Sequence, residues 1–203
     1  MGGFGPFGPG EGCGPFARRG YHHGRRLIVE RGASGFTLAD AAKLAGVSPA
    51  APYRHFKDRE ALLAEVATEG FALFGQRLGE AMRAATDPVS GFREMGRVYL
   101  AFAREQPGLY AAMFSLCATP EGAAASPARH SFEMLIEGIA RSIGGGKRPP
   151  EETHNLAVQV WALSHGLAML AGSGQLGQDV DAETLLITGT GRLLGIPPPS
   201  SKP

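Results

Sequence analysis

Apolar residues recur at intervals of three and four along most of the chain after residue 20, and Gly, Pro or capping residues repeatedly interrupt this pattern. A spacing near 3.6 residues indicates amphipathic α-helices, whereas the alternating β-branched runs typical of strands are few. Helices are expected to begin and end at the interruptions. The pattern therefore predicts an all-α fold, with later helices over 58–85, 89–105, 107–117, 126–143, 150–172 and 181–194.

A first short helix is predicted to begin after Thr37. The Thr37 hydroxyl can accept a hydrogen bond from the helix N-terminus, and Asp40, three residues later, completes a carboxylate variant of the capping box. Leu38 and three alanines then form one apolar face, and Gly46 is expected to end the helix.

A second short helix is predicted after a three-residue turn that contains Gly46. Ser48 is its expected N-cap, and Pro49 takes the first helical position, where a missing N–H costs nothing. Pro52 falls at the fourth position and loses only the first intrahelical hydrogen bond. We expect a helix with a rigid N-terminus.

Two short helices joined by such a turn form the helix-turn-helix pattern, whose second helix enters the DNA major groove. Small side chains at Ala50 and Ala51 would let the backbone approach the bases. Three residues just behind can supply phosphate or base contacts: Tyr53, Arg54 and His55. An ordinary helical hairpin with a proline-started second helix is the alternative.

The net charge of +1 conceals an uneven distribution. Residues 18–59 contain nine basic and three acidic side chains, a net charge of +6, which leaves −5 on the remainder. A basic segment attached to a mildly acidic body is typical of a nucleic-acid-binding module beside a regulatory domain. A solvated basic face without a partner is the alternative.

The two ends of the chain differ from the rest in composition. Residues 1–20 are mostly Gly, Pro and Phe and are expected to be disordered. The chain has neither a run of about 18 apolar residues nor a charged-then-apolar leader, so we predict no membrane association and a cytoplasmic protein. Cys13 and Cys117 are interpreted as free thiols, because their separation fits neither a metal site nor a disulfide framework.

Signals for catalysis are weak. His165 lies four residues after Trp161 on one helix face, but no His, Asp or Glu cluster at ligand spacing accompanies it. A core histidine is therefore the preferred interpretation, and His22 and His23 are assigned to a helix start. The chain lacks a Gly-rich phosphate loop and a Ser/His/Asp order. We predict no enzyme activity, no catalytic residues, no bound metal and no cofactor.

The segment Gly35–Ala67, "GFTLADAAKLAGVSPAAPYRHFKDREALLAEVA", resembles the DNA-binding domain of the TetR family of bacterial transcriptional regulators. Two further segments are similar to one subgroup of that family, which carries a Trp-His-Gly segment in its C-terminal domain. They are "YHHG" at Tyr21–Gly24 and "WALSHGLAMLAGSGQL" at Trp161–Leu176. The resemblance covers about 21–196 and excludes both ends.

The resemblance implies a helix-turn-helix domain of three helices over 21–67 and a helical effector-binding and dimerisation domain over 68–196. Outside it, a disordered Pro-rich end is expected over 197–203. It implies that Thr37 and Lys57 contact phosphate, that Tyr53 and His55 hold the DNA backbone, and that Arg54 is a further candidate. Three residues would face the major groove: Ser48, Ala50 and Ala51.

The family also implies a ligand-responsive repressor that binds a palindromic double-stranded DNA operator as a homodimer, with dimer helices around 161–171 and 183–194. A small apolar or aromatic effector would bind among Met and aromatic side chains, each of which has a purely structural role as its alternative. The candidate residues are Phe92, Tyr99, Phe102, Tyr110, Met113, Phe114, Trp161 and His165.

One departure from the family pattern supports a second function. Gly24 runs directly into the segment 25–31, which leaves the first helix about ten residues short of the pattern. The alternative is a small-molecule-binding or interaction protein that has lost operator binding with this helix. An enzyme that uses His165 and Cys117 is a third hypothesis.

Overall fold

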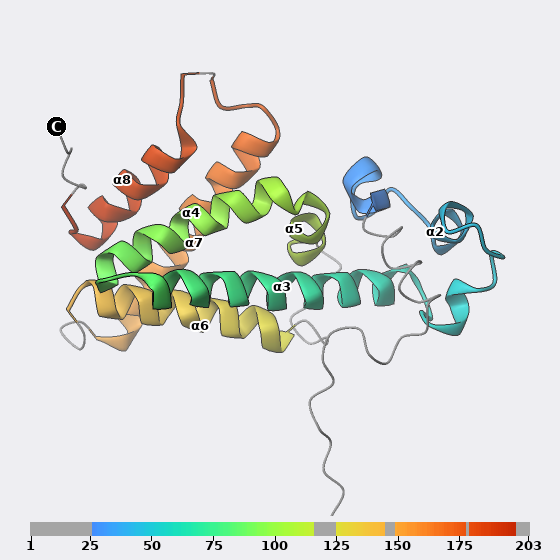
Figure 1. The fold of residues 1–203 in the computed structure, drawn as a ribbon, viewed down its shortest axis with the longest axis horizontal. Coiled ribbons are helices and arrows are strands. Elements are labelled where there is room, and N and C mark those ends of the chain that lie inside the picture. The colour runs from blue at the N-terminus through green and yellow to red at the C-terminus, as the bar shows by residue number, and fades with distance from the viewer. Residues whose placement is uncertain (1–25, 116–124, 145–148, 178, 198–203) are drawn as a thin grey trace, which may run out of the picture. The chain divides into compact units, whose positions relative to one another are not determined.

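The computed structural model describes residues 26–115, 125–144, 149–177 and 179–197, and the regular elements in these ranges are all helical (Figure 1). This confirms the predicted all-α fold. The chain divides into two compact units. The N-terminal unit lies within Met1–Phe71 and Pro107–Ala125, and the C-terminal unit within Ala72–Gln106 and Ser126–Pro203.

The N-terminal unit is built from short elements. Residues 26–31 are helical and are followed by α2 (Leu38–Leu44), the 3₁₀-helix η1 (Pro52–Arg54), the first part of α3 (Arg59–Ala84) and α5 (Pro107–Met113). The elements and the loops between them contribute side chains that are less than one tenth exposed, among them Leu27, Ile28, Phe36, Leu38, Phe56, Leu63 and Leu109. These side chains form the apolar interior that holds the short elements.

Local hydrogen bonds explain the bounds of α2. Thr37 and Asp40 form the reciprocal capping box that the sequence predicts. At the other end, Gly46 has a φ of 68°, a left-handed conformation that glycine adopts without a steric penalty. The N–H of Val47 donates to the Ala42 carbonyl and that of Gly46 to the Lys43 carbonyl, which is the Schellman arrangement. The prediction that the helix stops at Gly46 is confirmed.

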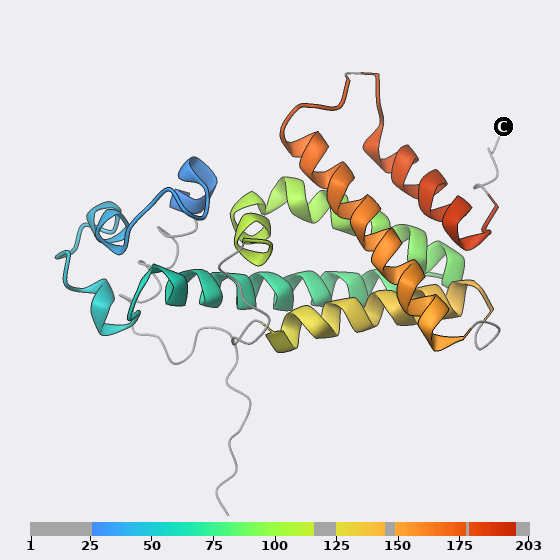
Figure 2. The ribbon, with the colours of Figure 1, turned by 180° about the vertical axis from the view of Figure 1, so that it is seen from behind.

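The C-terminal unit contains the rest of α3, α4 (Pro88–Glu105), α6 (Ala125–Ser142), α7 (Pro150–Gly172) and α8 (Ala182–Leu194). The helix α6 lies along the second part of α3 in both views (Figures 1 and 2), whereas α7 packs against α4 and α8. Its core includes a buried cluster of Phe92, Ile139, Leu156, Ala157, Val160 and Leu194.

The predicted bounds of these long helices agree with the structure to within two residues, and those of α7 coincide with it. Carboxylates cap α4 and α8, because Asp87 accepts from the Ser90 N–H and Asp181 from the N–H groups of Glu183 and Thr184. One prediction was too long: α5 ends at Met113 rather than at residue 117. Within the described ranges, every helix is too short or too polar to cross a membrane.

Candidate nucleic-acid interface and effector site

The N-terminus of α2 is held by Thr37 and Asp40. The Thr37 hydroxyl and its backbone N–H both donate to Asp40 Oδ2, at 2.7 and 2.8 Å, while the Asp40 N–H donates to Thr37 Oγ1 at 3.2 Å. These hydrogen bonds, with help from Arg31 3.7 Å away, hold the pKa of Asp40 below its ordinary value. The hydrogen of the Thr37 hydroxyl is thus engaged within the chain, so a phosphate contact by this group requires it to turn away from Asp40.

The segment 48–56, here called the reading segment, differs from the predicted α-helix. Three of its backbone hydrogen bonds are of the i→i+3 type, from Ala51 to Ser48, from Arg54 to Ala51 and from His55 to Pro52, and one i→i+4 bond, from Phe56 to Pro52, closes the segment. Regular structure begins after Ala51 and consists of the three residues of η1. The prediction of an α-helix from Pro49, capped by Ser48, was therefore wrong.

Pro52 explains this difference. In an α-helix, the carbonyl of Ser48 would accept from the N–H of residue 52, which proline lacks, and here it accepts from Ala51 at 2.9 Å instead. An i→i+3 bond at that point gives the tighter 3₁₀ geometry. Pro52 and Phe56 are both buried and anchor the segment to the unit.

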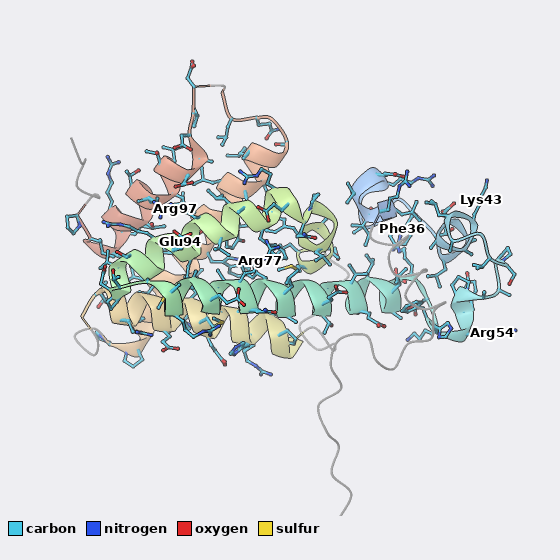
Figure 3. All side chains as sticks on the ribbon, in the orientation of Figure 1. Phe36, Lys43, Arg54, Arg77, Glu94 and Arg97 are labelled. Atoms are coloured by element: carbon cyan, nitrogen blue, oxygen red, sulfur yellow. The ribbon has the colours of Figure 1, made fainter. Side chains whose placement is uncertain are left out.

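Most of the residues predicted to contact DNA are accessible. Tyr53 is 57% exposed and the Lys57 side chain is 86% exposed, whereas Ala51 is half-buried. The other exposed candidates are Thr37, Ser48, Ala50, Arg54 and His55. Figure 3 shows Arg54 pointing outward, as does Lys43, and Phe36 pointing into the unit. Lys43, an exposed basic residue in the last turn of α2, was not among the residues predicted to contact DNA.

The start of α3 fixes the far end of the reading segment. Asp58 caps α3 by accepting from the Ala61 N–H at 2.8 Å, and its other carboxylate oxygen lies 3.6 Å from Lys57 Nζ. Arg59 donates a hydrogen bond at 2.9 Å to the carbonyl of Ser34, a residue that precedes α2. The candidate phosphate contact at Lys57 is therefore held next to a well-anchored helix start.

The eight candidate effector residues fall into two sets, one in each unit. In the N-terminal unit, the rings of Tyr110 and Phe114 lie 4.8 Å apart, and Phe114 meets Phe71 edge to face at 5.7 Å. Met113 packs on the backbone of α3, because an added Cβ at Gly70 would lie 2.7 Å from its Cγ. These three candidates belong to the packing of α5 on the first part of α3.

In the C-terminal unit, Phe74 of α3 is the centre of a second ring cluster. Its ring lies 5.2 Å from those of Tyr99 and Phe102 on α4. The Tyr99 hydroxyl lies 3.4 Å from Nδ1 of His165 on α7, within hydrogen-bond distance. Burial lowers the pKa of His165. Phe74 was missed from the sequence, although its spacing from Phe71 and Leu78 along α3 is typical of a helix face that points inward.

The remaining two candidates have different surroundings. Phe92 lies in the core cluster with Ile139 and Val160. Trp161 is 41% exposed, and its ring lies 5.8 Å from that of Phe132. The structure thus brings Tyr99, Phe102 and His165 together, and sets Phe92 and Trp161 in other contacts.

The assignments of Cys13, His22, His23 and Cys117 fall outside the described residues. Within the described part of the chain, His, Cys, Asp and Glu side chains nowhere gather in a group of three that could hold a metal ion.

Two family models match the chain. Residues 21–66 match the model described as bacterial regulatory proteins, tetR family, and residues 92–192 match the tetracyclin repressor-like C-terminal domain. The chain belongs to the TetR family. The matched ranges include the reading segment at one end and the Trp161–Gly166 stretch at the other.

Several solved structures share this fold. A protein of unknown function from Rhodococcus sp. RHA1 is 25% identical, with a TM-score of 0.74 over 93% of this chain and 98% of that one. A tetR-family regulatory protein from Rhodococcus RHA1 is 16% identical, with a TM-score of 0.73 over 93% and 100% of the two chains. AibR, solved with isovaleryl coenzyme A and operator DNA, is 19% identical, with a TM-score of 0.65 over 88% and 98%. A comparison with curated protein sequences gave no match.

As a TetR-family member, the chain is a DNA-binding transcriptional regulator and not an enzyme. The solved structures below 25% identity support the fold alone, namely an N-terminal helix-turn-helix unit followed by a helical C-terminal domain.

Proposed function

We propose that this TetR-family regulator is a cytoplasmic, ligand-responsive repressor that binds a near-palindromic operator as a homodimer. The observation that carries the DNA-binding part is the reading segment, which presents small and cationic side chains to solvent between two well-capped helices. Ser48, Ala50 and Ala51 would approach the bases, whereas Tyr53, Arg54, His55 and Lys57 would contact the DNA backbone. Thr37 would reach a phosphate from the start of α2.

The surface of α7 and α8 supports the homodimer. Large apolar side chains on these helices are between 38% and 53% exposed: Val158, Trp161, Met169 and Leu170 on α7, and Leu185 and Leu193 on α8. A patch of this kind on adjacent helices is typical of a protein–protein interface. A twofold-symmetric dimer would cover it on both copies and would supply the two reading segments that a palindromic site requires.

Small residues on α7 would allow the two copies to pack closely. Ala162 is exposed, and a Cβ added at Gly166 would meet nothing within 4 Å of its own chain. By contrast, a Cβ at Gly189 would lie 2.8 Å from Leu163 Cδ2. Gly189 therefore serves the packing of α8 on α7 within one chain, and we assign the close approach between copies to Ala162 and Gly166.

The effector would bind in the C-terminal unit at the ring cluster formed by Phe74, Tyr99 and Phe102, beside His165. To release DNA, it must bind the non-operator conformation more tightly than the operator-bound one, by about 3 kcal/mol for a hundredfold shift. An apolar or aromatic compound suits the aromatic side chains at this position.

A mobility-shift assay with the DNA that flanks the protein's own gene tests this function. We expect retardation by the wild-type protein at nanomolar to micromolar concentration, and weaker retardation by Lys57→Ala. Glu65→Ala, on the exposed side of α3, is the matched control and should bind as the wild type does. If the folded protein retards no DNA fragment that carries an inverted repeat, the repressor hypothesis is wrong. The alternative, a small-molecule-binding or interaction protein that has lost operator binding, then takes its place.

A further inference from the structure

The ring cluster of the C-terminal unit contains one polar pair. Tyr99 is 7% exposed and Phe102 fully buried, so the Tyr99 hydroxyl is carried into an apolar environment, where it meets His165 Nδ1 at 3.4 Å. His165 is half-buried and comes from α7, so the pair links two helices that pack together. A hydroxyl and an imidazole can each donate or accept a hydrogen bond, so this pair can receive a polar group of either kind.

Two arginines of this unit, Arg77 and Arg97, are already bound to carboxylates. Arg77 lies over the Phe102 ring, 5.6 Å from its centroid, and its Nη1 donates to Glu105 at 2.9 Å. Arg97 donates to Glu183 of α8 at 2.6 Å and to Glu94 at 2.9 Å, and it lies between α4 and α8 (Figure 3). An anionic ligand that bound to Arg77 or Arg97 would have to displace the carboxylate that each of them already holds.

We infer that the effector of this regulator is an uncharged, mostly apolar molecule with one hydrogen-bonding group, which Tyr99 and His165 receive between α4 and α7. This inference rests on the proposed function and specifies its ligand class. Burial of a carboxylate without a cationic partner is strongly unfavourable, whereas a neutral amide, ketone or alcohol needs only a hydrogen-bond partner. The surroundings of His165 agree with this interpretation, because burial lowers its pKa and so favours the neutral imidazole.

Matched pairs of aromatic probes test the inference directly. The probes are benzamide, naphthalene-2-carboxamide and biphenyl-4-carboxamide, each paired with the carboxylate of the same ring system. Calorimetric titration of the full chain at pH 7 should show that at least one amide binds about tenfold more tightly than its carboxylate. In Tyr99→Phe, which keeps the ring but removes the hydroxyl, the affinity for that amide should fall about tenfold. Tyr53→Phe, in the reading segment, is the control and should leave it unchanged.

Three outcomes would overturn the inference: a carboxylate that binds as tightly as its amide, an amide affinity that Tyr99→Phe and His165→Gln both leave unchanged, or failure of all three amides to bind. Thermal unfolding of each variant shows that the fold is retained. The titrations contain no DNA, so their outcome does not depend on the mobility-shift assay. Failure of the inferred ligand class can therefore be distinguished from failure of operator binding.

Discussion

At the scale of single residues, short-range hydrogen bonds decide where helices begin, and they use carboxylates that protonate in acid. Asp40, Asp87 and Asp181 each accept hydrogen bonds at a helix start, and each has a pKa below its ordinary value of 3.8 for this reason. A carboxyl group with a lowered pKa in the folded state stabilises that state when it is ionised. These caps therefore act at neutral pH and fail in acid.

The Asp40 cap gives a prediction about pH. Its contribution to the free energy of unfolding is fully present above the ordinary pKa of 3.8 and is lost as pH falls through the lower pKa of the folded state. Asp40→Asn should therefore be less stable than the wild type in urea unfolding at pH 7, and the difference should be smaller at a pH below 3.8. Glu65→Gln serves as the control. A stability difference that stays constant between the two pH values would show that the carboxylate charge has no role.

Lys57 gives a prediction about salt. If its ammonium group contacts one phosphate, Lys57→Ala should weaken binding to all DNA sequences alike and lower the slope of log K against log salt by about 1. Fluorescence anisotropy at several salt concentrations, with the operator and with unrelated DNA, measures both quantities. A slope equal to that of the wild type would place Lys57 away from the phosphates.

At the scale of elements, Pro52 converts a potential α-helix into a 3₁₀ turn. Pro52→Ala restores the N–H that can donate to the Ser48 carbonyl, so the backbone ¹³C shifts of residues 50–55 should move toward α-helical values. Pro49→Ala is the matched control, because position 49 would lie at the helix start, where no such bond is lost. Unchanged shifts in Pro52→Ala would mean that burial of the segment, rather than the missing N–H, sets its geometry.

The short elements of the N-terminal unit should also open before the long helices. The helix α2 has 7 residues and η1 has 3, whereas α7 has 23, and short helices depend on tertiary packing to persist. Amide hydrogen exchange at Thr37–Ala45 should therefore be faster than at the centre of α7. Equal protection of the two helices would contradict this ranking.

At the scale of the whole molecule, the proposed dimer is the arrangement on which the operator hypothesis depends. Gly166→Arg adds a long charged side chain where its Cβ meets nothing in its own chain, and loss of a helix-interior glycine favours the helix by about 1 kcal/mol. The variant should therefore fold, give a monomeric mass in light scattering at micromolar concentration, and bind operator DNA at least tenfold more weakly. Glu133→Arg on α6 controls for the added charge. A dimeric mass for Gly166→Arg would exclude this surface.

Local sequence determined the number and bounds of most helices. Thr37, Asp87 and Asp181 start helices, and Gly46 ends one, through hydrogen bonds and backbone preferences that reach no further than a few residues. Such signals can be seen in the sequence because the interacting groups are neighbours along the chain. The capped segment before "AGVS" indicated the helix-turn-helix family for the same reason.

Tertiary structure determined which residues from distant parts of the chain lie in contact. Tyr99 and His165 are 66 residues apart in the chain. The apolar periodicity of α4 and of α7 shows which face of each helix is buried, but it does not show which residues of the two helices meet. Phe74 connects Tyr99 with Phe102 only because α3 and α4 pack at that turn. Packing between distant segments selects among conformations that local preferences leave close in energy, so these features could be read only from the folded chain.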